Sequence, residues 1–331
     1  MTTHELNAIT VADDLVEFLE NHPSHLAGVH SVFPHAVNLL VDEDVLITLT
    51  NRDDITPMGL RVDCAASFGE YLKAGDQVCL SLDRFKAVNR LFTLNLQDAG
   101  VWKTRSISSQ GARPIEEVAR VRIALIKWLA KQPAQGLLPL LSRLAQLSAN
   151  SRPAVDNIYS RYIADDLATF TKAINTSNWE HALRIADQLV GFGMGSTPAC
   201  DDFLAAYLVV LNLANGQNPC CYPWIREFCK TIADKAKSRT TLISANMLRH
   251  AAEGKISRTH QRLIQTCLFN DSGELEDLAH QVMKHGATSG GDFLLGLICA
   301  LEWYQFTMTI TEKEGERAWV EPNQPQPVPG I

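Results

Sequence analysis

One segment of the chain places alternating glycines, a hydroxyl and two acids before a predicted helix. From Gly191 to Leu204 it reads Gly-Phe-Gly-Met-Gly-Ser-Thr-Pro-Ala-Cys-Asp-Asp-Phe-Leu. Glycine permits a positive φ and the close approach of another group. Thr197 suits the N-cap position and Pro198 the first helical position. Free backbone amides at such a helix start attract carboxylate or phosphate groups. The predicted binding residues are Gly191, Gly193, Gly195, Thr197 and Pro198.

A second segment, from Gly286 to Gly296, repeats this arrangement. Both segments contain Gly-x-Thr-x-x-x-Asp without a gap, ending at Asp201 and at Asp292. Two such helix starts facing each other would present hydroxyls and amides to a small carboxylate, phosphate or carbamoyl compound. The second start contributes Thr288, Ser289 and Gly290 to the predicted site, and the predicted catalytic acids are Asp201, Asp202 and Asp292.

A third segment, from Ser238 to Gly254, predicts a helix with small and hydroxyl side chains on one face. It adds Thr240, Thr241, Ser244 and Arg249, whose guanidinium offers a fork for an oxyanion. Ordinary capping and close helix packing explain each of these segments taken singly. The adjacent acids Asp201 and Asp202 favour a site, because a helix start needs only one early acid.

The surrounding pattern predicts an α+β protein, with a small β-barrel or sandwich-like lobe followed by a larger all-helical lobe. Short apolar runs between turn residues predict strands, and from residue 113 the period becomes helical. After a first helical stretch that begins near Ile115, nine further helical stretches are predicted between residues 137 and 307, and Gly216, Gly254 and Gly286 stand where C-terminal caps are expected. The predicted parts are an N-terminal helix in 1–23 (periodic over 10–21), a β-rich domain over 24–108, a helical domain carrying the glycine motifs over 113–310, and an extended proline-rich tail over 311–331.

Composition and charge exclude several classes of protein and favour a folded globular one. The chain has 331 residues, 46% of them hydrophobic, and a formal charge of −7, which disfavours disorder and a nucleic-acid-coating role. No apolar run reaches the roughly 18 residues of a membrane span, and we read no signal peptide, so we expect a cytoplasmic protein without a membrane partner. The eight cysteines show no zinc spacing and are expected to be free thiols. No cofactor motif is evident; Mg²⁺ held through waters by the paired aspartates stays open.

Together the three segments resemble the AllH (YlbF-like) family of uncharacterised-domain proteins, which occurs beside FdrA-type and YlbE-type proteins. The family's glycine motif, approximately G-x-G-x-G-L-T-P-S-x-D-D-x-L-x-G, is similar to the stretch from Gly191 to Ala206. The helix motif resembles the stretch from Thr240 to Gly254, and the motif G-H-T-S-G-x-D-x-L-x-G resembles the stretch from Gly286 to Gly296. The resemblance spans about residues 26–300 and is weaker in the β lobe.

The resemblance implies a subunit of an oxamate carbamoyltransferase in purine (allantoin) degradation, with FdrA-type and YlbE-type partner subunits. Such a system converts oxalurate and phosphate into oxamate and carbamoyl phosphate. The chain departs from the family pattern where Ala199 replaces a serine and Ala287 a histidine, which removes a hydroxyl and an imidazole. Cys200 could substitute as a polar or nucleophilic group. The alternative is a non-catalytic subunit that binds a small anion or assists assembly of a carboxylase-like complex.

Overall fold

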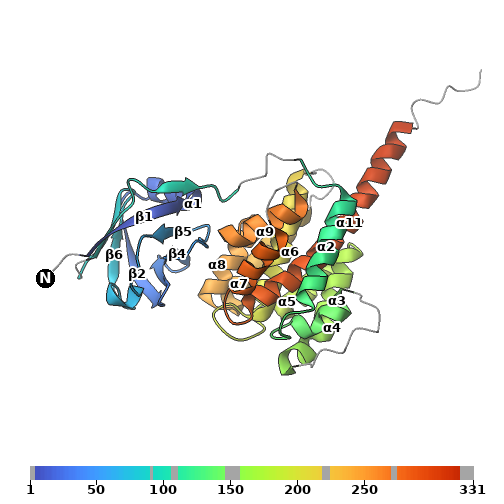
Figure 1. The fold of residues 1–331 in the computed structure, drawn as a ribbon, viewed down its shortest axis with the longest axis horizontal. Coiled ribbons are helices and arrows are strands. Elements are labelled where there is room, and N and C mark those ends of the chain that lie inside the picture. The colour runs from blue at the N-terminus through green and yellow to red at the C-terminus, as the bar shows by residue number, and fades with distance from the viewer. Residues whose placement is uncertain are drawn as a thin grey trace, which may run out of the picture.

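A closed β-barrel forms the N-terminal lobe of the computed structural model, which describes residues 4–89, 92–105, 111–145, 157–217, 224–269 and 274–320 (Figure 1). Eight described strands follow the order β5-β4-β3-β2-β6-β7-β8-β1, and antiparallel pairing of β1 with β5 closes the ring. β9 pairs in parallel with β1. The strands are β1 (His4–Ala12), β2 (His25–Val32), β3 (Ala36–Val41), β4 (Val45–Thr50), β5 (Gly59–Val62), β6 (Gln77–Leu80), β7 (Arg84–Ala87), β8 (Phe92–Asn95) and β9 (Gly100–Trp102).

Alternation along the strands fills the barrel. In β7, Phe85 and Ala87 are buried while Arg84 and Lys86 are exposed, as the two-residue period of a strand requires. Helix α1 (Asp13–Asn21) buries Leu15 and Leu19 against the barrel core. The prediction of an N-terminal β-barrel lobe is therefore confirmed.

The first segment differs from the prediction, which places a helix over 10–21. The chain instead forms β1 up to Ala12, and the helix begins at Asp13. A register shift between Ala8 and Thr10 interrupts the pairing of β1 with β5. Such a bulge disturbs the simple alternation that marks a strand in sequence. Residues up to Ala12 form a strand because β1 pairs with the distant strand β5 to close the barrel.

The second lobe is all-helical, as predicted. Its elements are α2 (Ile115–Leu129), a 3₁₀ turn (Leu138–Leu140), α3 (Leu141–Leu144), α4 (Ile158–Asn175), α5 (Trp179–Leu189), α6 (Ala199–Gln217), α7 (Trp224–Arg239), α8 (Leu242–Ala251), α9 (Arg258–Leu268), α10 (Leu275–Met283) and α11 (Ser289–Val320). α11 continues past residue 311, where the sequence predicts the start of an extended tail, because no proline interrupts it before Pro322. Most of the linker over 106–112, Cys220, Cys221 and the tail over 321–331 lie outside the described residues.

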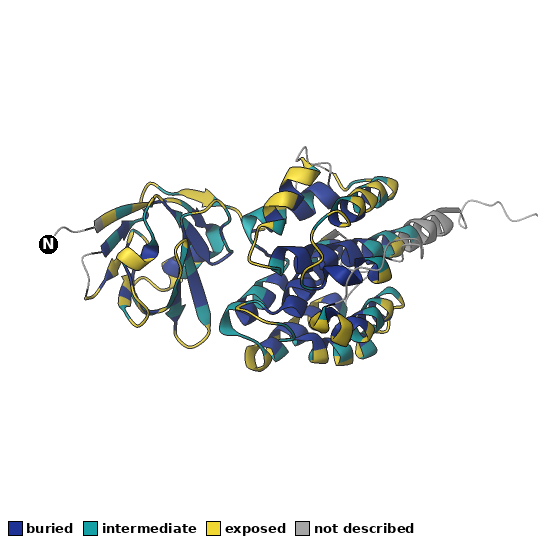
Figure 2. Cartoon of the chain, turned by 60° about the horizontal axis from the view of Figure 1, so that its bottom comes forward, coloured by how far each residue is buried: buried dark blue, intermediate teal, exposed yellow. Residues whose placement is uncertain are grey.

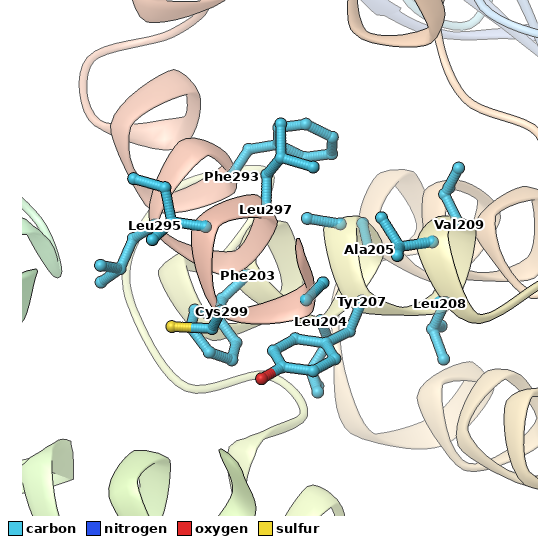
Figure 3. Packing of buried hydrophobic residues seen from close by; sticks show 14 of the residues in the cluster. Phe203, Leu204, Ala205, Tyr207, Leu208, Val209, Phe293, Leu295, Leu297 and Cys299 are labelled. Atoms are coloured by element: carbon cyan, nitrogen blue, oxygen red, sulfur yellow. The ribbon is translucent and has the colours of Figure 1, made fainter. Parts of the chain in front are cut away.

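Helices α6 and α11 form the centre of the helical lobe. Both are buried over most of their described length, as Figure 2 shows in dark blue. Their apolar side chains, including Phe203, Tyr207 and Phe293, interlock in the core (Figure 3). The two backbones approach so closely that a Cβ at Gly296 would lie 2.3 Å from the Phe203 carbonyl oxygen. This crossing brings the two glycine-led helix starts together.

Hydrogen bonds and ion pairs join the two lobes. Asn246 of α8 accepts a bond from the Leu46 amide (3.2 Å) and donates to the Asp44 carbonyl (2.9 Å). The buried Lys255 ammonium lies 2.6 Å from an Asp14 carboxylate oxygen. The Asn246 bonds hold β4 and its neighbouring turn against α8 (Figure 1), and the ion pair joins α1 to the loop after α8. None of the helices in the described ranges has the length and apolarity that a membrane span requires.

Candidate functional site

Asp201 links the three sequence motifs into one structural unit. Its Oδ1 accepts the Gly191 amide at 2.8 Å, and its Oδ2 accepts the hydroxyls of Thr240 at 2.5 Å and Ser244 at 2.7 Å. Burial raises the pKa of Asp201, while these three hydrogen bonds act in the opposite direction. Both oxygens are occupied by protein donors, so Asp201 positions the glycine loop against α8 and is not presented to a ligand.

Asp292 also makes a contact within the fold. Its Oδ1 accepts the Leu137 amide at 2.6 Å, and burial raises its pKa to about 7 although the bonds from Leu137 and Thr288 lower it. A Cβ at Gly136, which has φ +55°, would lie 2.3 Å from the same oxygen. Asp292 therefore anchors the loop before α3, and within the described residues its Oδ2 has no hydrogen-bond partner.

The two glycine-led helix starts meet directly. The Thr197 and Ser289 hydroxyls lie 2.9 Å apart, and Asp202 lies beside them on the first turn of α6. Burial raises the pKa of Asp202 well above its usual range, the carboxyls of Asp292 and Asp201 raise it further, and the two hydroxyls oppose the shift. Asp202 is 4% exposed, and its Oδ2 has no hydrogen-bond partner in the part of the chain that the structure describes.

The backbone amides at these helix starts are largely engaged within the protein. The Cys200 amide donates to the Phe192 carbonyl at 3.0 Å, and the Gly290 amide donates to the His285 carbonyl at 3.0 Å. The glycines serve close packing: with φ +81°, a Cβ at Gly191 would lie 2.2 Å from the Arg239 carbonyl oxygen. Hydroxyl and carboxyl side chains, more than the amides, are thus available to a ligand.

A cavity of about 160 Å³ lies between the barrel and the helical lobe, in front of these side chains. Polar side chains from both lobes surround it, together with several apolar ones. Its lining residues are Asn38, Leu46, Thr48, Asp54, Thr56, Pro57, Met58, Thr197, Asp202, Ile243, Asn246, Met247, His250, Ile256, Ser257, His260, His285, Ser289 and Phe293. Of the predicted site residues, Thr197, Asp202 and Ser289 line this cavity.

The other predicted site residues are not among those that line the cavity. Thr241 caps α8 by accepting the Ser244 amide at 3.1 Å and donates to the Ser196 carbonyl. Arg249 donates a hydrogen bond to the Asn246 side-chain oxygen at 2.6 Å. Asn246 is the residue that also bonds the barrel backbone at Asp44 and Leu46. These residues are placed to shape the site and are not among its lining residues.

A cluster that the sequence did not predict pairs Asp54 of the barrel lobe with Ser257, His260 and His285 of the helical lobe. Asp54 Oδ1 accepts the Thr259 amide at 2.8 Å, and its Oδ2 accepts the Ser257 hydroxyl at 3.0 Å. His285 Nδ1 lies 3.3 Å from the same Oδ2, and the Ser257 hydroxyl lies 2.7 Å from His260 Nδ1. Burial would raise the pKa of Asp54, but the hydrogen bonds from His285 and Thr259 and the nearby histidines hold it well below its usual range.

Comparison with known families separates the chain into the same two lobes. A family described as "Oxamate carbamoyltransferase subunit AllH" matches residues 189–301, and the "AllH family N-terminal domain" matches residues 7–101. The chain belongs to the AllH family. An AllH protein is a subunit of an oxamate carbamoyltransferase, so it acts together with other protein chains. No solved structure matches the chain.

The two AllH regions each supply one side of the cavity. The N-terminal domain provides Asp54 and Thr56, and the region over 189–301 provides Asp202, His285 and Ser289. The cavity therefore exists only where the two AllH regions meet.

Cys200 is not placed to act as the substitute nucleophile. It is fully buried, and burial together with the neighbouring aspartates raises the pKa of its thiol well above the usual range. A reactive cysteine needs exposure and a lowered pKa. Within the described ranges, no group of three or more histidine, cysteine, aspartate or glutamate side chains is arranged to hold a metal ion.

Proposed function

We propose that the cavity between the two lobes is a substrate site of an oxamate carbamoyltransferase. In this proposal the enzyme converts oxalurate and phosphate into oxamate and carbamoyl phosphate in allantoin degradation, and FdrA-type and YlbE-type subunits complete the complex. The observation that carries the proposal is Asp202: a buried acid at the junction of two helix starts, with an unpartnered oxygen, on the wall of the cavity.

The reaction needs groups of this kind. A phosphate oxygen forms a bond to the carbamoyl carbon of oxalurate, the bond from that carbon to the amide nitrogen breaks, and the nitrogen takes a proton to become the NH₂ of oxamate. Burial favours the protonated form of Asp202, which can donate a hydrogen bond or a proton to the departing nitrogen. The Thr197 and Ser289 hydroxyls beside it bond each other, which leaves one hydroxyl hydrogen of the pair to donate to a substrate oxygen.

The substitution Asp202→Asn in the reconstituted complex tests this proposal. Asparagine keeps the shape of the side chain but cannot deliver a proton, so we expect kcat for carbamoyl transfer to fall by roughly 100-fold or more. The matched control is Asp234→Asn on the surface of α7, where the side chain is 52% exposed and pairs with Lys237. The control is expected to keep full activity.

Circular dichroism and assembly of the complex confirm that the variant is folded. Full turnover by the folded Asp202→Asn complex would contradict the catalytic proposal. If that variant also lost binding of oxamate while keeping turnover, the non-catalytic anion-binding alternative would be favoured.

A further inference from the structure

Three histidines, His250, His260 and His285, are among the described residues that line the cavity. The His285 side chain is 54% exposed, whereas that of His260 is 8% exposed and its ring packs edge-on against Phe293, with 4.5 Å between the ring centroids. Burial lowers the pKa of His260 to about 4 and that of His250 to about 3, so both of these rings are neutral at pH 7. Of the three, His285 is therefore the histidine that a substrate can reach.

The backbone of His285 is fixed beside the first turn of α11. Its amide donates to the Val282 carbonyl at 2.9 Å, and its carbonyl accepts the Gly290 amide at 3.0 Å. Ser289, which directly precedes Gly290, contacts the Asp202 carboxyl with its hydroxyl. His285, Ser289 and Asp202 all line the cavity. The same short segment therefore presents His285 to the cavity and contacts Asp202.

Asp54 determines which ring nitrogen of His285 is free. Its Oδ1 accepts the Thr259 amide and its Oδ2 accepts the Ser257 hydroxyl, so both carboxylate oxygens act as acceptors. His285 Nδ1 lies 3.3 Å from Oδ2 and must carry the hydrogen that it donates there. The neutral ring then has its lone pair on Nε2, which bonds none of the described residues. A carboxylate holds the imidazole of a catalytic base in the same tautomer.

The proposed reaction moves a proton from phosphate to nitrogen. Monohydrogen phosphate carries a proton that carbamoyl phosphate has lost, and the amide nitrogen of oxalurate gains a proton when it becomes the NH₂ of oxamate. The reaction therefore needs a proton acceptor beside the attacking oxygen as well as a donor beside the departing nitrogen. Burial favours the protonated form of Asp202, which suits the donor. A protonated carboxyl group cannot serve as the acceptor in the same step.

We propose that His285 is the catalytic base of carbamoyl transfer. Its Nε2 takes the proton of the phosphate while the phosphate oxygen bonds to the carbamoyl carbon, and Asp202 gives its proton to the nitrogen as the carbon–nitrogen bond breaks. His285 then carries an additional proton and Asp202 has lost one, and transfer of a proton through water from His285 to Asp202 restores both. This inference rests on the proposed function and adds the group that accepts the proton.

Two substitutions in the reconstituted complex distinguish a base from a contact between the lobes. His285→Ala removes both ring nitrogens, whereas His285→Asn places an amide N–H where Nδ1 bonds Asp54 and has no counterpart of Nε2. We expect kcat for carbamoyl transfer to fall by roughly 100-fold or more in both variants. The matched control is His280→Ala, at an exposed histidine of α10 that is not among the lining residues, and it is expected to keep full activity.

Added imidazole tests the proton transfer itself. The space left by the half-exposed His285 ring in His285→Ala is open to free imidazole, which can accept the proton in its place. Imidazole is expected to raise kcat of this variant by roughly tenfold or more and to leave the wild type unchanged. Thermal unfolding and assembly of the complex show that each variant is folded.

The outcomes separate this inference from the proposed function. Full turnover by the folded His285→Asn complex would overturn the inference, because the bond to Asp54 would then be the whole role of the residue. Loss of turnover in His285→Ala that imidazole does not restore would overturn it as well. In either case, loss of turnover in the Asp202→Asn complex would still uphold the proposed function. Unchanged turnover in both Asp202→Asn and His285→Asn would remove the two together.

Discussion

Replacing Asp292 with asparagine is expected to stabilise the protein at alkaline pH. Asp292 is fully buried, and its Oδ1 accepts the Leu137 amide. Asparagine has nearly the same shape and keeps that acceptor. It removes the cost of ionising a carboxyl in the core, where burial raises the pKa to about 7.

The size of the effect follows from the difference between the folded and unfolded states. The ordinary pKa is 3.8 and the folded value is about 7, and each unit of difference corresponds to about 1.4 kcal/mol. The folded state therefore holds the proton more tightly, and wild-type stability is lost as pH rises from about 4 to above 7. The total is about 4 kcal/mol, and the asparagine variant lacks this loss.

Urea denaturation at a series of pH values between 4 and 8 measures this effect. The difference in free energy of unfolding between Asp292→Asn and wild type is expected to grow by about 4 kcal/mol over that range. Asp165→Asn, at a side chain that is 90% exposed, serves as the control and is expected to give a nearly constant difference. A constant difference for Asp292→Asn would refute the reasoning, because it would mean that burial does not shift this carboxyl.

Three further substitutions test the contacts that shape the site. Asp201→Ala strands buried donors and is expected to lower the free energy of unfolding by about 3 kcal/mol; a loss below about 1 kcal/mol in urea denaturation would argue against its linking role. Gly296→Ala forces a Cβ to within 2.3 Å of an α6 carbonyl and is expected to cost about 2 kcal/mol, measured by thermal unfolding, whereas Gly216→Ala meets no atom within 4 Å and should not destabilise. Asn246→Ala removes the bond to the Leu46 amide and is expected to speed hydrogen exchange there; unchanged exchange would show that the lobes are held without it.

Local pattern was sufficient for most of the fold. Helical periodicity and the glycine and proline signals predict the helical lobe, since those features act over a few residues. The strand β1 was missed because its pairing partners, β5 and β8, lie far along the chain. The predicted tail begins at residue 311, whereas α11 continues to Val320. The sequence after residue 311 is polar and lacks helical apolar periodicity, although no proline ends the helix before Pro322.

The sequence predicted the site residues of the helical lobe but not those of the barrel lobe. Thr197, Asp202 and Ser289 belong to repeated helix-start motifs, and the structure brings them together at one wall of the cavity. Spacing alone could not assign different environments to Asp201 and Asp202. Neighbouring positions on a helix point in directions about 100° apart, so one acid faces the glycine loop and the other lines the cavity.

The barrel side of the site carries no local signal. Asp54 and Thr56 stand in an ordinary loop between β4 and β5, and they become site residues only because the lobes meet. Asp54 contacts Ser257 and Thr259, which lie about 200 positions later in the chain. A pattern read along the chain has no means of pairing such residues.

A structure determined with oxamate bound tests the central claim most directly. We predict that oxamate occupies the cavity between the lobes, within hydrogen-bond distance of the Asp202 carboxyl group. Oxamate found outside this cavity, away from Asp202, would contradict the account.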